Sequence, residues 1–263
     1  MSALVIPLSS VRSEVDPEEW EARVQLAAAY RLMHRLGMTD WIYNHITARV
    51  PSNHEHFLIN PWGLSYSEIT ASNLYKIDLE GNLVLKPDIP FGTNQAGFII
   101  HSAVHAARPD AGCIIHTHTK AGVAVSAMRC GLLPISQSAM RFSGRIGYHD
   151  YEGPATNLEE RGRLAQNLGG GDVLVLRNHG MLVVGPTIHT AFHLHQRLEV
   201  ACQVQCAAMA AGTELVIPSP EVQRHASATM DVNASSNAIP NGGEIEWAAL
   251  VRELDREEPS YRD

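Results

Sequence analysis

The segment CIIHTHT, from Cys113 to Thr119, decides how the chain folds around its chemistry. Its first three residues are apolar and predict the end of a short buried strand. His116 and His118 follow two residues apart, and alternate side chains of an extended chain point to the same side. Both imidazoles can therefore face one metal ion, and neutral imidazole binds zinc, iron, copper or nickel. Two histidines on a polar strand face are the simpler alternative for so short a pattern.

A third histidine decides between these alternatives. The sequence from Val173 to Val184 contains two apolar, strand-like runs that are interrupted by Arg177-Asn178-His179-Gly180. A turn of this composition presents one imidazole at a strand end. Catalytic metals are held by three protein ligands with one position left open. We therefore predict that His116, His118 and His179 bind one divalent metal ion.

The composition excludes several classes of protein. The chain has 263 residues, which allows one large domain or two small ones, and 45% of them are hydrophobic. The net charge of -8 and the lack of a Lys/Arg cluster argue against nucleic-acid binding. We expect no signal peptide and no membrane segment, because no stretch reaches the ~20 apolar residues of a span. Four cysteines without a CxxC pair favour a reduced, cytoplasmic compartment.

Composition along the chain predicts three parts. Residues 1–17 are expected to be an extended N-terminal arm, 18–225 a domain, and 226–263 a flexible linker and C-terminal tail. The linker begins where the composition shifts to Ser, Asn, Ala, Pro and Gly. Within the tail, Glu244 to Leu254 predicts one last helix, and the charged residues 255–263 are expected to be mobile.

The N-terminal third of the domain alternates a helix with antiparallel strands. An apolar stripe from Trp20 to Leu36 predicts the helix. Trp41 to Val50 and Phe57 to Asn60 predict two strands joined by a polar turn. Leu74 to Asp78 and Leu83 to Leu85 flank a Glu-Gly-Asn sequence, which is typical of a hairpin. This order indicates a layered α/β or α+β domain.

Two polar segments are candidates for the lining of a site. GTNQAG, Gly92 to Gly97, precedes a helix expected from Phe98 to Ala107, and backbone N–H groups at a helix start can hold an anion. An ordinary loop before a helix is the alternative. GYHDYEG, Gly147 to Gly153, collects titratable and aromatic groups. That composition fits a loop that lines a site and equally fits an exposed loop.

Other histidines lie on predicted helices. His101 and His105 are four residues apart, which places them on one helix face, either as donors to a metal site or simply packed. His189 and His193 share a face of a helix expected from Thr187 to Gly212. No Glu follows His189, as HExxH would require, so we favour a partly buried or interface helix.

The sequence resembles the class II aldolase/adducin family. The resemblance rests on FGTNQAGFIIHSAVHAARPDAGCIIHTHTKAGVAVSA, Phe91 to Ala127, and on LRNHG, Leu176 to Gly180, and it covers about Trp20 to Gly212. FGTNQAGF, AVSAMRCGLLPIS and YHDYEG are closer to the adducin head and its bacterial relatives than to the sugar-phosphate aldolases. Membership implies a three-layer α/β/α domain with a largely antiparallel sheet. It also implies a homotetramer or related oligomer with sites at subunit interfaces, and zinc, with iron or manganese as alternatives, on His116, His118 and His179.

The departures from the aldolases bear on the chemistry. The position of their catalytic Glu is Gly97, their two phosphate-binding serines fall on Gln95 and Ala96, and their proton-donating tyrosine maps near Gln137. Asn44 and Gly63, in contrast, match phosphate-loop positions of the aldolases. We therefore predict that the substrate is bound by Asn44, Gly63, Thr93, Asn94 and Gln95.

Three functional hypotheses follow. The first is a metal-dependent lyase for a small unphosphorylated hydroxy-carbonyl compound, with Tyr148, His149 or Asp150 as acid/base in place of the Glu. The second is a non-haem iron oxygenase that acts on a 2-oxo or 2-hydroxy acid, which needs no Glu. The third is an adducin-like binding module without catalysis. The acidic end of the chain argues against the third, because it lacks the basic tail of the adducins.

Overall fold

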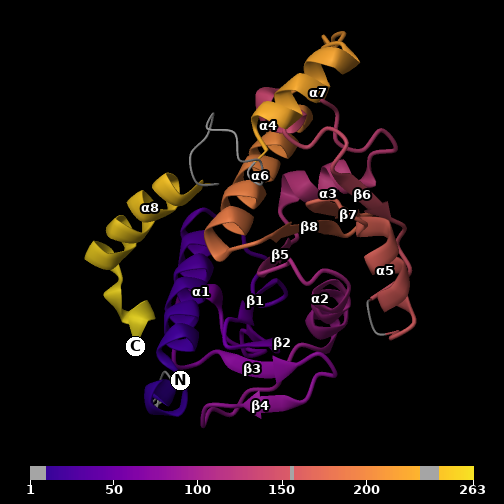
Figure 1. Cartoon of the computed structure of the whole chain (residues 1–263). Helices are drawn as coiled ribbons and strands as arrows, with labels where there is room; N and C mark the ends of the chain where they lie inside the picture. The colour runs from indigo at the N-terminus through magenta and orange to yellow at the C-terminus, as the bar shows by residue number, and fades with distance from the viewer. Residues whose placement is uncertain (1–9, 155–156, 232–242) are drawn as a thin grey trace, which may run out of the picture.

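An eight-stranded sheet forms the middle of the computed structural model, which describes residues 10–154, 157–231 and 243–263 (Figure 1). Its strand order is β4-β3-β2-β1-β5-β8-β7-β6. All neighbouring strands are antiparallel except β6 and β7, which are parallel. The strands are β1 His45–Val50, β2 Asn53–Ile59, β3 Tyr75–Asp78, β4 Leu83–Leu85, β5 Cys113–Thr117, β6 Ile146–His149, β7 Val173–Leu176 and β8 Gly180–Gly185. The predicted, largely antiparallel central sheet is confirmed.

Helices cover both faces of this sheet. They are α1 Pro17–Arg35, α2 Gln95–Ala107, α3 Lys120–Ala127, α4 Gln137–Met140, α5 Glu160–Leu168, α6 Ile188–Ala210, α7 Pro220–Thr229 and α8 Glu244–Glu257. On β5, Ile114 packs in the core under α2 and α5, whereas Cys113 and Ile115 pack on the opposite face, in the core under α1 and α6. The predicted three-layer α/β/α arrangement is therefore confirmed. Among the described residues, no helix is both long and apolar enough to cross a membrane.

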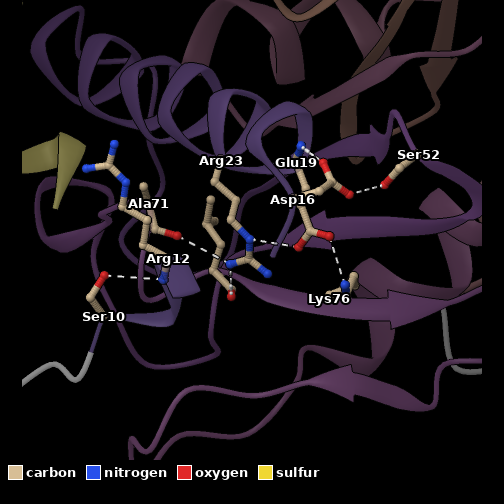
Figure 2. Close-up of polar contacts among 9 residues, drawn as sticks. Ser10, Arg12, Asp16, Glu19, Arg23, Ser52, Ala71 and Lys76 are labelled. Atoms are coloured by element: carbon tan, nitrogen blue, oxygen red, sulfur yellow. Dashed lines mark hydrogen bonds and ion pairs between the residues drawn. The ribbon is translucent and has the colours of Figure 1, made fainter. Parts of the chain in front are cut away.

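The start of α1 is fixed by a cap and by a buried ion pair. The side chain of Asp16 accepts a hydrogen bond from the backbone N–H of Glu19 at 2.8 Å. Arg23 is fully buried, and its Nε donates to Glu19 at 2.9 Å while Nη1 donates to the carbonyl of Leu74 at 2.9 Å (Figure 2). Lys76 of β3 also bonds Glu19, at 2.8 Å. This network ties α1 to the segment that leads into β3.

Replacing Arg23 by Met is expected to lower the free energy of unfolding by about 3 kcal/mol, because it leaves the Glu19 carboxylate buried with only Lys76 as a cationic partner. Urea denaturation followed by circular dichroism measures the change. The control is Glu18→Gln, an exposed change on the same helix, which should alter stability by less than about 0.5 kcal/mol. Equal stability of the two variants would contradict the role given to Arg23.

The C-terminal residues are packed against the domain. α8 is followed by a 3-10 helix, Pro259–Arg262, in which Tyr261 is completely buried. The Tyr261 carbonyl accepts from the backbone of Ala71 at 2.9 Å, and its hydroxyl donates to Asp255 at 2.6 Å. Residues 255–263, which the sequence predicted to be mobile, thus form helical structure and bury one side chain. The charged residues in this segment suggested that it is exposed to solvent. Arg262 instead pairs with Asp255 at 2.7 Å, and the Tyr261 ring is buried in the core.

The other predicted boundaries differ in detail. The predicted last helix is α8, and α7 extends into the segment predicted as linker; residues 232–242 of that segment lie outside the described part of the chain. Residues 1–9 of the predicted arm also lie outside it, and Val11–Glu14 form a 3-10 helix rather than an extended chain. The division into three parts remains a prediction.

The strand predicted from Trp41 begins only at His45. Residues 41–43 form a turn, in which Trp41 has a positive φ of 50°. The turn is closed by Asn44, whose Oδ1 accepts a hydrogen bond from the backbone N–H of Asp40 at 2.6 Å. Such a side-chain bond to the backbone competes with strand pairing, and the hydrophobic pattern does not reveal it.

Candidate metal centre

Three histidines meet where β5 ends and β8 begins. Antiparallel pairing sets Thr117 of β5 opposite Met181 of β8, so that the residues just beyond these strand ends lie side by side. His116 lies within β5, His118 directly follows it, and His179 precedes β8. Nε2 of His118 lies 2.9 Å from Nε2 of His116 and 3.0 Å from Nε2 of His179. The structure thus brings together the three residues that the sequence nominates as metal ligands.

The turn before β8 needs the residues that the sequence provides. Asn178 has a positive φ of 57°, a conformation that asparagine tolerates better than most residues. A Cβ on Gly180 would lie 2.3 Å from the carbonyl oxygen of Thr117. Only glycine therefore allows β8 to start this close to β5, and this approach places His179 beside His118.

Hydrogen bonds on the far side of two rings orient their lone pairs toward one point. Nδ1 of His116 lies 3.0 Å from the carbonyl oxygen of Met181, and Nδ1 of His118 lies 3.1 Å from Oδ2 of Asp40. A carbonyl or carboxylate oxygen only accepts, so Nδ1 carries the proton and Nε2 presents its lone pair. Converging lone pairs repel one another unless a cation lies between them. The donor set therefore fits a divalent metal ion. In protein metal sites, a ligand histidine usually donates its other ring N–H to a carbonyl or carboxylate oxygen, as His116 and His118 do here.

Electrostatics keep these imidazoles in the form that binds metal. Burial, and then the neighbouring histidines, lower the pKa of His116 well below its usual value. Burial and the nearby His118 lower the pKa of His179 to about 4. Both rings are therefore neutral at pH 7, as a ligand nitrogen must be.

A second group of buried histidines adjoins the three. The ring of His45, the first residue of β1, lies 5.0 Å from that of His116, centre to centre. Its Nδ1 is 2.8 Å from Nε2 of His101, and Thr47 Oγ1 bonds both His101, at 2.7 Å, and His105, at 2.8 Å. His101 and His105 thus lie behind His45 and form an outer layer of the site. Burial lowers the pKa of His45 to about 3, so this ring is also neutral.

His45 occupies the space beside Gly97. A Cβ built on Gly97 would lie 2.6 Å from Cδ2 of His45 and 2.9 Å from its Nε2. Because His45 is buried and bonded to His101, it cannot simply swing away. A side chain at position 97 and the observed position of His45 therefore exclude each other.

Sequence reasoning missed both His45 and Asp40. His45 is in register with His116, since β1 pairs with β5, but no local spacing connects the two residues. Two spacings are consistent with the contacts of His45. Residues 45 and 47 share one strand face, residues 101 and 105 share one helix face, and hydrogen bonds connect the two faces. Asp40 is 78 positions from His118 and carries no signal of its own.

The predicted substrate-binding residues differ in their roles. Asn44 is fully buried, and its Nδ2 has no hydrogen-bond partner among the described residues. Asn94 caps α2 by accepting from the backbone N–H of Gly97 at 3.1 Å, while Thr93 is exposed. Gly63 has a φ of 121°, and a Cβ there would lie 2.6 Å from the Phe91 ring.

Gln95 is the first residue of α2, and its side chain lies outside the described part of the structure. The buried, unpaired amide of Asn44 is thus the group in this set that most needs a partner, because an unpaired buried donor is costly. Substrate binding by the whole set remains a prediction.

The predicted acid/base residues separate into two groups. The ring of Tyr148 lies under the guanidinium of Arg177, and its hydroxyl accepts from the backbone N–H of Leu132 at 3.2 Å. His149 and Asp150 line a small hollow together with His179. His149 is buried there, 3.2 Å from a carboxylate oxygen of Glu160, whereas Asp150 is exposed. Their catalytic role stays a prediction, for which the structure places Asp150 more favourably than Tyr148.

Replacing His118 by Ala is expected to remove most bound metal, because two imidazoles hold an ion far more weakly than three. Asp40→Asn should weaken metal binding about 10- to 100-fold, since it changes the acceptor that orients His118. Elemental analysis and competition with a chelator measure both effects. His34→Gln, a change of an exposed histidine on α1, serves as the control. Stoichiometric metal in His118→Ala protein would overturn the site.

Comparisons with known proteins identify the family of the chain. The model of the family described as Class II Aldolase and Adducin N-terminal domain matches residues 24–206. A protein of Caulobacter vibrioides, named as a candidate class 2 aldolase, is 45% identical over 258 residues, covering 98% of each chain. Alpha-adducin of Rattus norvegicus is 45% identical over 264 residues, which cover 96% of this chain but 36% of the adducin. The crystal structure of an aldolase II superfamily protein from Pseudomonas syringae is 50% identical with a TM-score of 0.89, covering 97% of this chain and 100% of that one. The chain therefore belongs to the class II aldolase/adducin family.

Proposed function

We propose that the chain is a metal-dependent enzyme, a lyase that acts on a small unphosphorylated hydroxy-carbonyl compound. The observation that carries the proposal is the convergence of the Nε2 atoms of His116, His118 and His179, supported by Met181 and Asp40. Zinc is the first choice of metal, ahead of iron or manganese, because three neutral imidazoles suit it. A bound divalent metal would act as a Lewis acid toward a substrate oxygen.

The residues around the three histidines would bind and orient the substrate. The Nδ2 group of Asn44 is a buried donor that a substrate oxygen can satisfy. Asp150, which lines the same hollow as His179, is an exposed titratable group and would exchange a proton with the substrate. His149 would orient this loop through its contact with Glu160 rather than act on the substrate.

The replacement of the aldolase Glu argues against a sugar phosphate as substrate. The resemblance puts Gly97 at the position of that Glu, and His45 fills the adjoining space. A ring held at its Nδ1 by His101, with a pKa of about 3, is a poor substitute for a carboxylate base. The phosphate-binding serines are also absent, since their positions are Gln95 and Ala96.

Two further functions are tied to specific observations. A non-haem iron oxygenase is favoured by the ligand set, because three histidines without a carboxylate leave open positions for oxygen and a chelating 2-oxo or 2-hydroxy acid. A non-catalytic binding module is favoured by the 45% identity to alpha-adducin, of which this chain matches 36%. Elemental analysis of protein purified without added metal separates these cases: zinc supports the lyase, iron the oxygenase, and neither metal the binding module.

A homotetramer in the cytoplasm is part of the same proposal. Trp41, Tyr43 and Tyr151 leave 83%, 52% and 54% of their surface exposed. Trp41 follows Asp40, which bonds His118, and the ring of Tyr151 lies 6.4 Å from that of His179. Exposed aromatic residues this close to a site are typical of a surface that a second subunit covers.

Cleavage of fuculose or ribulose phosphates is expected to be negligible, even with zinc bound. Loss of a positioned acid/base typically lowers a rate by about a hundred- to ten-thousand-fold. A coupled turnover assay compares sugar phosphates with unphosphorylated hydroxy-carbonyl compounds at equal metal content. Cleavage of the phosphates at rates typical of aldolases would overturn the substrate class proposed.

Gly97→Glu is expected to destabilise the protein and to leave it without sugar-phosphate activity, because the new side chain collides with His45. Adding His45→Ala should restore part of the lost stability, since it opens the space that the Glu needs. The two single variants and the double variant form a cycle in which thermal unfolding is measured. Additive effects of the two changes would contradict the exclusion between the two side chains.

A further inference from the structure

A cavity of about 340 Å³ lies between α6 and α8, on the helical layer that also contains α1 (Figure 1). Its walls are of two kinds. One is apolar and includes Phe192, Trp247 and Leu250. The other is polar and includes His193 and Arg197 of α6, with Glu246 of α8. Its volume is within the range of pockets that hold small molecules.

Buried nitrogen atoms at and near the polar wall have no partner. Nε2 of His193 and Nε of Arg197, which belong to residues that line the cavity, and Nε of Arg141, which does not line it, make no hydrogen bond within the part of the chain that the structure describes. His193 is only 8% exposed and Arg141 only 6%. A buried donor without a partner is costly, and a charged one costs more. Two such groups in the wall, with a third whose charge acts on both, are therefore unusual for a surface that serves only to pack two helices.

The charges at this wall are unbalanced. Burial, and then the charge of Arg197, lower the pKa of Arg141, so the two guanidinium groups repel each other. Burial, and then Arg141, lower the pKa of His193 to about 4. Glu246 and Asp231 oppose this repulsion at Arg141. The Glu246 carboxylate, however, lies 4.0 Å from Nδ1 of His193 and its side chain is 56% exposed, while Asp231 already pairs with Arg145 at 2.7 Å. An anion in the cavity would supply both the negative charge and the acceptors that the wall lacks.

We propose that this cavity binds a small organic anion, with its carboxylate or phosphate group against His193 and Arg197 and its apolar body against Phe192 and Trp247. Arg141 contributes its charge from behind the two α6 residues. Arginine suits this role because its planar fork matches the geometry of carboxylates and phosphates. The site is separate from the three metal-binding histidines, and it holds whether or not the proposed lyase activity does.

Isothermal titration with phenyl phosphate, benzoate and benzyl alcohol tests the site. The two anions share an apolar body with the neutral alcohol, so the charged head group is the variable. Saturable binding of at least one anion, with none of the alcohol, is expected, and the preferred anion identifies the head group. Quenching of tryptophan fluorescence that is lost in Trp247→Phe protein would locate the bound molecule. Equal binding of the alcohol, or no binding of either anion, would refute the proposal.

Three variants separate this cavity from other sites. Arg197→Gln should weaken anion binding about ten- to a hundredfold, the range of a lost charge-assisted hydrogen bond. Glu246→Gln should tighten it several-fold, a gain that misfolding cannot produce. Arg256→Gln, an exposed change on the same helix α8, should leave it unchanged. Binding that survives Arg197→Gln but is lost in His118→Ala would place the anion on the metal centre instead and overturn the assignment.

Discussion

The register between β5 and β8 is the constraint on which the whole site depends. It sets Thr117 opposite Met181, which places His118 and His179 side by side and the Met181 carbonyl oxygen 3.0 Å from Nδ1 of His116. A shift of one residue would turn His116 to the opposite face of the sheet and remove the carbonyl that fixes its tautomer. Gly180 enforces the register, because any Cβ there would strike the backbone of Thr117. Secondary structure and metal chemistry are thus specified by the same contact.

The layer behind the ligands explains how so many imidazoles share one interior. His45, His101 and His105 are buried, and burial depresses the pKa of each ring. A neutral imidazole is both a donor and an acceptor. The rings can therefore form a chain of hydrogen bonds in which His45 bonds His101, and the Thr47 hydroxyl bonds both His101 and His105. The same chain would be unstable with several protons added, because like charges would then meet in a medium of low dielectric constant. Neutrality is therefore a condition of the fold here as well as of metal binding.

Local patterns predicted the parts of the site that are local in the sequence. The spacing of His116 and His118 follows from the pleat of a strand, and the Asn-His-Gly sequence predicted the turn that carries His179. Resemblance to a family supplied the sheet and its layers. His45 and Asp40 escaped because their contacts cross between strands and loops that are distant in the chain. The packed C-terminus was not predicted for another reason. The charged residues around Tyr261 suggested exposure to solvent, but Arg262 and Asp255 pair with each other while the Tyr261 ring is buried.

Membership of a family does not fix the chemistry of a site, and the pair formed by His45 and Gly97 shows why. In this chain, the imidazole and the glycine fit together, so neither can change alone without a clash or a void. A side chain as large as Glu at position 97 would consequently require a different arrangement of this interior, and not only the exchange of one residue. Function belongs to sites and not to folds. The family relationship therefore establishes the fold. The chemistry must follow from the residues at the site: three converging histidines, a buried, neutral His45, an Asn44 Nδ2 group without a partner among the described residues, and an exposed Asp150.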